Sequence, residues 1–258
     1  MILPQSLRPP HGCPPGAEPM AIEGGREGVL VLHGFTGSPW EVAPVAQALA
    51  QQGFTVAMPV LAGHATTVHA LNETTWHDWL KSAEDALAWL DARCDRVHHV
   101  GLSMGTLLTL LIARRRPSGR LGHIALLAPA LVLPEWQRVA MGTLARLGWP
   151  EVLGKADPLL ANGQKSPCYA AVPLRAGASF LALMDLVVAQ TPPMRALVLH
   201  GSADLTIPCA RATAIARRLL GSEAIVHIVP KAGHLLPRTD AGPQVVQEVV
   251  DWLQRYTS

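Results

Sequence analysis

The sequence has few cysteines, and they are not grouped. The chain of 258 residues contains four, which form no Cys-x-x-Cys pair. Disulfide frameworks and zinc sites need paired or closely spaced thiols, so neither is expected here. We therefore expect free thiols in a reducing compartment, at Cys13, Cys94, Cys168 and Cys209.

Charge is also scarce. Charged residues make up 16% of the chain and the formal net charge is +2. This balance gives no field strong enough to attract nucleic acid, and no cluster of lysine and arginine is interleaved with aromatic residues. The basic run 114–116 ends a predicted helix, where cations complement the helix dipole. Nucleic acid is therefore not an expected partner.

Long apolar runs and metal-ligand spacings are missing as well. No unbroken apolar segment is long enough to span a bilayer. Prolines interrupt residues 1–20, which lack the apolar core of a signal peptide. No His-Glu-x-x-His or comparable spacing indicates a metal site, and no cofactor is expected. These absences predict a cytoplasmic protein without stable membrane insertion.

The chain does contain enough apolar residues for a sizeable core. Hydrophobic residues make up 49% of it. Its length is within the range of one large α/β domain, so we predict a single domain over residues 1–258. Residues 1–25 are rich in proline and are predicted to form an extended arm over the surface, without a chemical role.

Predicted strands and helices alternate along the chain. Residues 27–35 form a continuous apolar run, typical of a strand covered on both faces. Residues 76–93 have apolar side chains at helical spacing. The alternation indicates right-handed crossovers and an α/β fold with a mostly parallel, twisted sheet and helices on both faces. Further strands are predicted at 54–60, 97–102, 123–131, 195–201 and 224–229, and further helices at 39–52, 106–116, 208–220 and 243–256.

The helix predicted at 39–52 has a recognisable start. Ser38 is placed as its N-cap, Pro39 as its first residue and Glu41 three residues after the cap. This is the spacing of a capping box, in which the serine and glutamate side chains each accept a backbone N–H. The helix is predicted to stop at Gly53.

The alternation lapses between residues 131 and 193. This segment has helical patches at 136–147 and 179–189, separated by links rich in glycine and proline. It is predicted to form a helical cap insertion over the carboxyl edge of the sheet. Its leucine, alanine and methionine content favours apolar acyl groups.

The sequence Gly101-Leu102-Ser103-Met104-Gly105 ends an apolar run and leads directly into a helix. Gly-x-Ser-x-Gly in this context is typical of a nucleophile elbow. The serine of an elbow lies at a strained turn, so the residues two before and two after it must be almost free of side chain. The hydroxyl then projects clear of the sheet beside a helix N-terminus, as acyl transfer requires. The alternative is a glycine-rich turn with an incidental serine.

A serine nucleophile needs a base within hydrogen-bond reach, and the base needs an acid to orient it. Asp204 and His234 each follow a predicted strand, in the order serine, acid, histidine. The carboxyl ends of parallel strands meet at one edge of a sheet, so the three should converge. The structural alternatives are a carboxylate at a helix start for Asp204 and a polar loop histidine for His234. Two other acids, Asp157 and Asp185, fall inside the insertion and follow no strand.

The sequence has eleven histidines, so the others also have to be interpreted. His98 and His99 lie within a predicted strand and are expected to be structural. His33 and His200 are expected to hydrogen-bond to loop backbone rather than to titrate. His64 lies in the loop 61–75, directly after Gly63.

Acyl transfer also needs donors for the developing oxyanion, each worth roughly 3 to 4 kcal/mol. Met104 directly follows the serine and Phe35 lies in the loop after the first strand of the parallel sheet, so their backbone N–H groups are the predicted donors. Gly34 and Gly37 would let that loop approach the substrate closely. The predicted substrate-binding side chains are those of Phe35, Met104, Leu205 and Leu235.

Several motifs together give the sequence a resemblance to a known family. They are His33-Gly34-Phe35-Thr36-Gly37, Gly63-His64, Asp78-Trp79, Gly101-Leu102-Ser103-Met104-Gly105, His200-Gly201-Ser202-Ala203-Asp204 with Pro208, and Gly233-His234. The sequence resembles the α/β-hydrolases, and among them the compact bacterial carboxylesterases and monoacylglycerol lipases, from about Val29 to the C-terminus. The resemblance implies that Ser103 is the nucleophile, Asp204 the acid and His234 the base, with an oxyanion hole at Phe35 and Met104.

The function predicted from these residues is that of a serine carboxylesterase. It would hydrolyse uncharged esters of short to medium acyl chain, with monoacylglycerols among the candidates, through an acyl-enzyme. The partner is a small-molecule ester, and the sequence leaves monomer and dimer open. The alternatives are another hydrolase with the same triad (a thioesterase, a carbon–carbon bond hydrolase or a peptidase) and a ligand-binding protein without catalysis.

Overall fold

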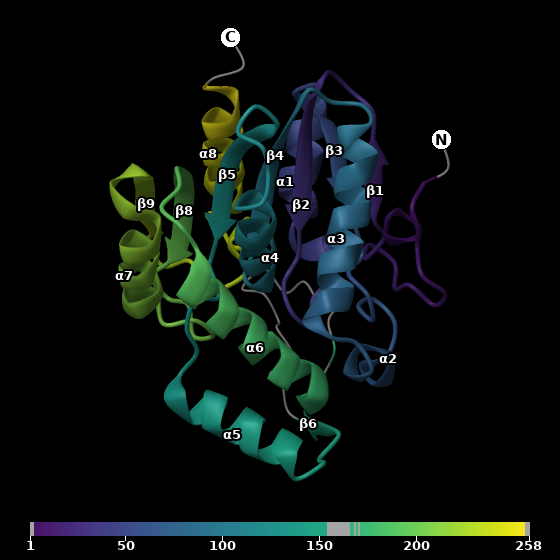
Figure 1. Cartoon of the computed structure of the whole chain (residues 1–258), viewed down its shortest axis with the longest axis vertical. Helices are drawn as coiled ribbons and strands as arrows, with labels where there is room; N and C mark the ends of the chain where they lie inside the picture. Colours follow the sequence, from purple (N-terminus) through teal and green to yellow (C-terminus); the bar gives the residue numbers. More distant parts are fainter. Residues whose placement is uncertain (1–2, 154–165, 168, 170, 256–258) are drawn as a thin grey trace.

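The computed structural model of the protein describes residues 3–153, 166–167, 169 and 171–255. Within them, seven strands form one sheet in the order β1-β3-β2-β4-β5-β8-β9, and only β1 runs antiparallel to its neighbour (Figure 1). The predicted α/β fold with a mostly parallel sheet is confirmed. The strands are β1 (Met20–Ile22), β2 (Glu27–Leu32), β3 (Thr55–Met58), β4 (Arg96–Leu102), β5 (Leu121–Leu127), β8 (Ala196–Gly201) and β9 (Ala224–Val229).

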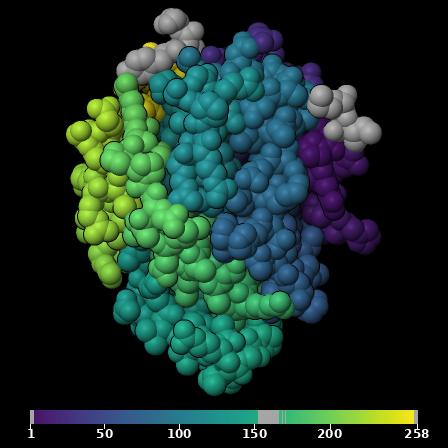
Figure 2. Space-filling model, viewed as in Figure 1, coloured from purple at the N-terminus to yellow at the C-terminus, as the bar shows by residue number. Residues whose placement is uncertain are grey.

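Helices cover both faces of the sheet and create two apolar cores. On one face α1 (Ala43–Gln51) and α8 (Gly242–Gln254) pack against the strands. The helices on the other face are α3 (Trp76–Asp91), α4 (Met104–Ala113), α6 (Leu174–Gln190) and α7 (Cys209–Leu220). Figure 2 shows this second face, with α6 crossing below α3 and α4. Because both faces are covered, the central strands are apolar on both sides.

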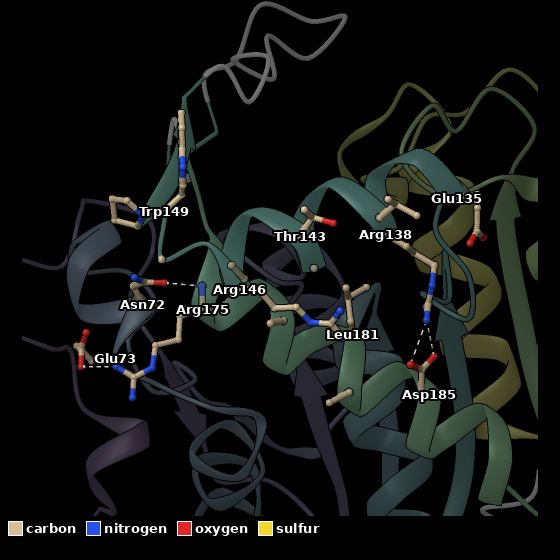
Figure 3. A pocket seen from close by; sticks show the side chains of 17 residues that line it. Asn72, Glu73, Glu135, Arg138, Thr143, Arg146, Trp149, Arg175, Leu181 and Asp185 are labelled. Carbon is tan, nitrogen blue, oxygen red and sulfur yellow. Dashed lines mark hydrogen bonds and ion pairs between the residues drawn. The ribbon is translucent and has the colours of Figure 1, made fainter.

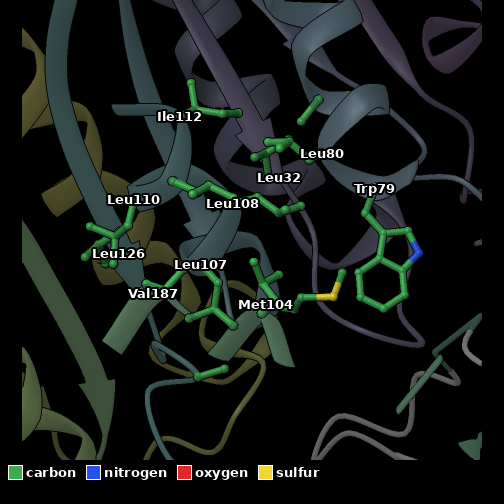
Figure 4. Packing of buried hydrophobic residues seen from close by; sticks show 14 of the residues in the cluster. Leu32, Trp79, Leu80, Met104, Leu107, Leu108, Leu110, Ile112, Leu126 and Val187 are labelled. Carbon is green, nitrogen blue, oxygen red and sulfur yellow. The ribbon is translucent and has the colours of Figure 1, made fainter. Parts of the chain in front are cut away.

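Helix α4 is the most deeply buried element of the second core. All ten of its residues are buried, which explains why its sequence shows almost no polar face. Leu107 and Leu108 pack among Leu32 of β2, Leu126 of β5 and Val187 of α6 (Figure 4). This packing fixes the N-terminus of α4, the end that follows Ser103.

Several predicted element boundaries are wrong by a few residues. Strand β2 ends at Leu32 rather than at residue 35, and β5 covers Leu121–Leu127 rather than 123–131. The chain remains buried beyond both strands, as at His33 and Ala128, although the hydrogen bonding between neighbouring strands has ended. An apolar run therefore overestimates the length of a strand. Helix α4 begins at Met104, directly after the serine.

The predicted capping box at Ser38 is wrong. Residues Pro39–Glu41 form a short 3-10 turn, and α1 begins only at Ala43. The Ser38 hydroxyl makes no capping hydrogen bond, and the buried Glu41 carboxylate accepts the N–H of Gly34. The spacing of a capping box was present without its geometry.

The N-terminal arm contributes a strand that the sequence analysis did not predict. Strand β1 pairs with β3 and is the edge strand of the sheet, and Leu7 and Ala17 of the same arm are themselves buried. Three residues are too few to show a strand periodicity. No helix of the described residues is long and apolar enough to cross a membrane.

The segment between β5 and β8 contains α5 (Glu135–Arg146), a two-stranded sheet of β6 (Glu151–Leu153) and β7 (Ala171–Pro173), and α6. Helix α6 buries residues such as Phe180 and Val187 against the main core, whereas no residue of α5 is buried. Helix α5 packs on α6 at the end of the molecule away from the main sheet (Figure 1). Residues 154–165, which include Asp157, and Cys168 lie outside the described residues.

A buried histidine in the core makes stability depend on pH. His99 of β4 is fully buried, and neither ring nitrogen has a hydrogen-bond partner among the described residues. Burial, with a smaller contribution from Arg116, lowers its pKa to about 3. The unfolded chain binds this proton near pH 6.5, so the stability linked to His99 is complete above that pH and is lost as the pH falls toward 3.

We expect His99→Leu to raise the free energy of unfolding by about 1 kcal/mol at pH 7, because it removes a buried polar group without a protein partner. Its stability should also fall less between pH 6.5 and 4 than that of the wild type. Urea denaturation across this pH range measures both effects. His11→Leu, at an exposed histidine, is the control. A wild-type pH dependence in His99→Leu would contradict the prediction.

Candidate active site

Ser103 lies at a sharp turn between β4 and α4. Its φ of 53° and ψ of −117° are strained for a residue with a side chain. The backbones on either side approach closely: a Cβ at Gly101 would lie 2.5 Å from the carbonyl carbon of Gly105, and one at Gly105 would overlap the carbonyl oxygen of Leu32. The two glycines of the motif are thus required by the crossing of strand and helix, as the sequence predicts.

The structure brings the three predicted triad residues together. The Ser103 hydroxyl lies 2.9 Å from Nε2 of His234, and Nδ1 of His234 lies 2.7 Å from Oδ2 of Asp204. Asp204 follows β8 and His234 follows β9, so the carboxyl edge of the sheet supplies all three. Because the Asp204 carboxylate accepts from Nδ1–H, Nε2 is left as the acceptor for the serine proton.

The Asp204 carboxylate is held by four donors. Oδ1 accepts the backbone N–H groups of Thr206 and Ile207 at 2.8 and 2.9 Å. Oδ2 accepts His234 at 2.7 Å and lies 3.2 Å from Nε2 of His200. Burial raises the pKa of Asp204, but the hydrogen bonds from His200, His234 and Ile207 outweigh it and hold this pKa well below its usual range. The carboxylate is therefore charged throughout the neutral range.

The predicted oxyanion donors lie on the segment directly after Ser103 and on the loop after β2, and neither has an acceptor among the described residues. Met104 is the first residue of α4, and the N–H groups of Met104 and Phe35 make no hydrogen bond to any described residue. The loop that carries Phe35 approaches the serine closely, since a Cβ at Gly34 would lie 3.3 Å from Cβ of Ser103. Two backbone donors on segments close to Ser103 are thus left without an acceptor among the described residues.

The side chains of His33, Glu41 and His64 hold the loop that carries Phe35 in place. Nε2 of His64 accepts the N–H of Thr36, and Nε2 of His33 accepts the N–H of Leu61 while its Nδ1 donates to the carbonyl of Gly34. Burial lowers the pKa of His33 to about 4, so its ring is neutral at pH 7. The expected backbone bonding of His33 is confirmed. Glu41 was missed as a site residue, because the sequence placed it in a capping box.

The predicted substrate-binding side chains do not share one environment. Phe35 stacks on Phe180 of α6, with the ring centroids 5.1 Å apart. Met104 is fully buried beside Trp79 (Figure 4). Leu235 is half-buried, and Leu205 is 94% exposed. Phe35 therefore connects the loop after β2 with helix α6 of the insertion, a contact that the sequence does not reveal.

A large cavity of about 870 Å³ lies elsewhere, between α5 and α6 (Figure 3). No triad residue lines it. Its charged side chains are largely paired, Arg138 with Asp185 and Arg175 with Glu73. Asp185, considered above as another acid, is engaged by Arg138 in this cavity and lies away from the serine.

Comparisons with known proteins place the chain among hydrolases. Residues 25–239 match the family Hydrolase_4, described as serine aminopeptidase, S33. A thermostable monoacylglycerol lipase of Bacillus sp. (strain H-257) is 47% identical over 102 residues, which cover 40% of this chain and 41% of that enzyme. A carboxylesterase of Bacillus subtilis (strain 168) is 31% identical over 101 residues, 39% of this chain and 41% of that enzyme. The matched stretches thus span about two fifths of these curated relatives.

Solved structures match over almost the whole chain. One, from a study of the metagenome-derived lipolytic enzymes LipS and LipT, has a TM-score of 0.87 at 28% identity and covers 94% of this chain and 99% of its own. A monoacylglycerol lipase of Paleococcus ferrophilus has a TM-score of 0.73 at 20% identity, with 92% and 98% covered. The second likeness concerns the fold alone.

The close crossing at Gly105 can be tested by adding one methyl group. Gly105→Ala should lower the free energy of unfolding by about 1 to 3 kcal/mol, because the new Cβ must push α4 away from the backbone of β2. Gly119→Ala is the matched control, since a Cβ there meets no atom within 4 Å. Urea denaturation compares the two variants. Equal stabilities would show that the crossing is looser than described.

Proposed function

The chain belongs to the Hydrolase_4 family (serine aminopeptidase, S33) of α/β-hydrolases, and we propose that it is a serine carboxylic ester hydrolase. The observation that carries the proposal is the chain of hydrogen bonds from Ser103 through His234 to Asp204. The relatives named as a monoacylglycerol lipase and a carboxylesterase support it. We propose uncharged esters of short to medium acyl chain as substrates, with monoacylglycerols as the lipid class to test first.

The first half of the reaction is acylation of the serine. His234 Nε2 takes the proton of the Ser103 hydroxyl as its oxygen attacks the ester carbonyl carbon. The carbonyl oxygen becomes negative and accepts the N–H groups of Met104 and Phe35. The intermediate then collapses, and His234 passes its proton to the departing alcohol. The Asp204 carboxylate stabilises the imidazolium while it exists.

The second half is hydrolysis of the acyl-enzyme. A water molecule enters after the alcohol has left, and His234 removes one of its protons as the oxygen attacks the acyl carbon. The same two N–H groups bind the second oxyanion. Ser103 then leaves with the proton held by His234, so the enzyme returns to its starting state and releases the carboxylic acid.

The surroundings of Phe35 favour an apolar acyl group. Its ring stacks on Phe180 and lies 5.5 Å from the ring of Trp79. These aromatic side chains can make van der Waals contacts but carry no charge that could pair with a charged substrate. An uncharged acyl chain can therefore bind beside them without the cost of burying an unpaired charge. This supports uncharged esters over charged ones.

Peptide-bond hydrolysis is the second candidate, because the family description names a serine aminopeptidase. An aminopeptidase must bind the charged N-terminal ammonium of its substrate, which calls for an available carboxylate. Asp204 is already engaged by four donors, and Glu41 is bonded to Gly34. Aminoacyl p-nitroanilides beside p-nitrophenyl esters separate the two activities.

We also propose a cytoplasmic location. Cys13, Cys94 and Cys209 are free thiols, as the sequence analysis expected, and free thiols are typical of a reducing compartment. Cys168, the fourth cysteine, lies outside the described residues.

Removing the serine hydroxyl tests the proposed nucleophile. Ser103→Ala should lower kcat for a p-nitrophenyl ester by at least about a thousandfold, because the attacking oxygen is lost. A fluorophosphonate should add one adduct to the wild type and none to Ser103→Ala, as measured by intact mass. Ser222→Ala, at an exposed serine, should keep both properties. Hydrolysis by Ser103→Ala at the wild-type rate would reject the assignment.

Truncation of Phe180 tests the acyl site. Phe180→Ala opens space beside Phe35, so we expect kcat/KM for longer acyl esters to rise several-fold relative to shorter ones. Trp136→Ala, at a side chain of α5 that is 71% exposed, is the control and should leave the ratio unchanged. The ratio is measured with p-nitrophenyl esters of increasing chain length. No change in Phe180→Ala would place the acyl chain elsewhere.

A further inference from the structure

A second histidine contacts the triad carboxylate. His200 lies near the end of β8, and its side chain and that of Asp204 are both completely buried. Nε2 of His200 is 3.2 Å from Oδ2 of Asp204, the same oxygen that accepts Nδ1–H of His234. Nε2 of His200 also lies 3.2 Å from the carbonyl oxygen of Ile207.

These contacts define the protonation of His200. A carboxylate and a carbonyl are acceptors only, so Nε2 must carry a hydrogen. Nδ1 is buried and has no hydrogen-bond partner among the described residues. A hydrogen on Nδ1 would be a buried donor without an acceptor, which is costly. His200 is therefore a neutral ring that donates from Nε2.

We propose that His200 is a positioning residue for the triad, which holds Oδ2 of Asp204 in the orientation that His234 requires. The proposal rests on the function proposed above. Each oxygen of Asp204 is approached by two donors, and the second on Oδ2 is His200, whose single Nε2–H is shared with the carbonyl oxygen of Ile207. Thr206 and Ile207 hold Oδ1, and His200 is the one donor on Oδ2 besides His234, so it holds this oxygen when the bond to His234 changes during the reaction.

A neutral donor suits this place better than a charged one. A cation beside Asp204 would compete with the imidazolium that forms on His234 during the reaction. The titratable groups that face this carboxylate are His200 on β8, His234 after β9 and the Cys209 thiol at the start of α7, whose pKa is raised by burial and by the charge of Asp204. His200 supplies a hydrogen bond without adding to this set of charges.

The test compares His200→Leu, which removes the donor, with His200→Gln, whose amide N–H₂ can still donate to Oδ2. For a soluble p-nitrophenyl ester, kcat of His200→Leu should fall roughly tenfold, about the value of one hydrogen bond to a charged group, while KM changes less. The acidic limb of its kcat/KM profile should move to higher pH, because an Oδ2 with one donor carries more charge toward His234. His200→Gln should retain most of kcat and the wild-type limb.

Either of two kinetic results would overturn the proposal: wild-type kcat and pH profile in His200→Leu, or an equal loss in His200→Gln. The tautomer is checked without substrate by NMR of the ring nitrogens of the wild-type protein. We expect a neutral Nε2–H ring for His200 across the neutral range. A charged ring or an Nδ1–H tautomer would refute the proposal even if His200→Leu failed to fold.

The same measurements separate this proposal from the proposed function. A wild-type protein that hydrolyses no ester and does not react with a fluorophosphonate would disprove the ester hydrolase assignment. The NMR tautomer of His200 would then still decide on the positioning role, because that measurement needs no substrate. A hydrogen on Nδ1 rather than Nε2 would reject the positioning role alone.

Discussion

The site depends on one steric constraint, the close crossing of β4 and α4. Gly101 lets the backbone of β4 meet that of α4, and Gly105 lets α4 lie against the end of β2. Ser103 is held at the turn in a conformation that costs on the order of 1 to 3 kcal/mol. Helix α4 offsets that cost, because all ten of its residues are buried. The hydroxyl is thus positioned by the core before any substrate arrives.

The same constraint explains how much of the site the sequence predicts. Ser103 and Asp204 each follow a buried strand, which is visible as an apolar run, and His234 follows the partly exposed edge strand β9. In a parallel sheet these strand ends meet at one edge, so chain order and topology together locate the triad. The limits of the strands are less predictable, because residues such as His33 and Ala128 stay buried after the ladder has ended.

Contacts made by loop side chains could not be predicted in this way. Glu41 has the spacing of a capping residue, yet its carboxylate accepts the N–H of Gly34, which lies in the loop after β2. Phe180 stacks on Phe35, although the two residues are far apart in the chain. Apolar periodicity predicts that α6 is a helix, but it does not predict which loop the helix packs against. Strand β1 is recognisable only by its pairing with β3. Each of these features depends on tertiary structure rather than on a local pattern.

The histidines around the triad make hydrogen bonds without adding charge beside the Asp204 carboxylate. His33 and His64 accept backbone N–H groups of loop residues, which fastens the loop that carries Phe35. Burial holds the pKa of His33 near 4, so this ring adds no charge beside a developing oxyanion. A neutral imidazole donates a hydrogen bond from one ring nitrogen and accepts one at the other. A carboxylate can only accept, and an ammonium can only donate. His234 is the histidine that is hydrogen-bonded to both Asp204 and Ser103, so the charge of the carboxylate supports the ring that takes the serine proton.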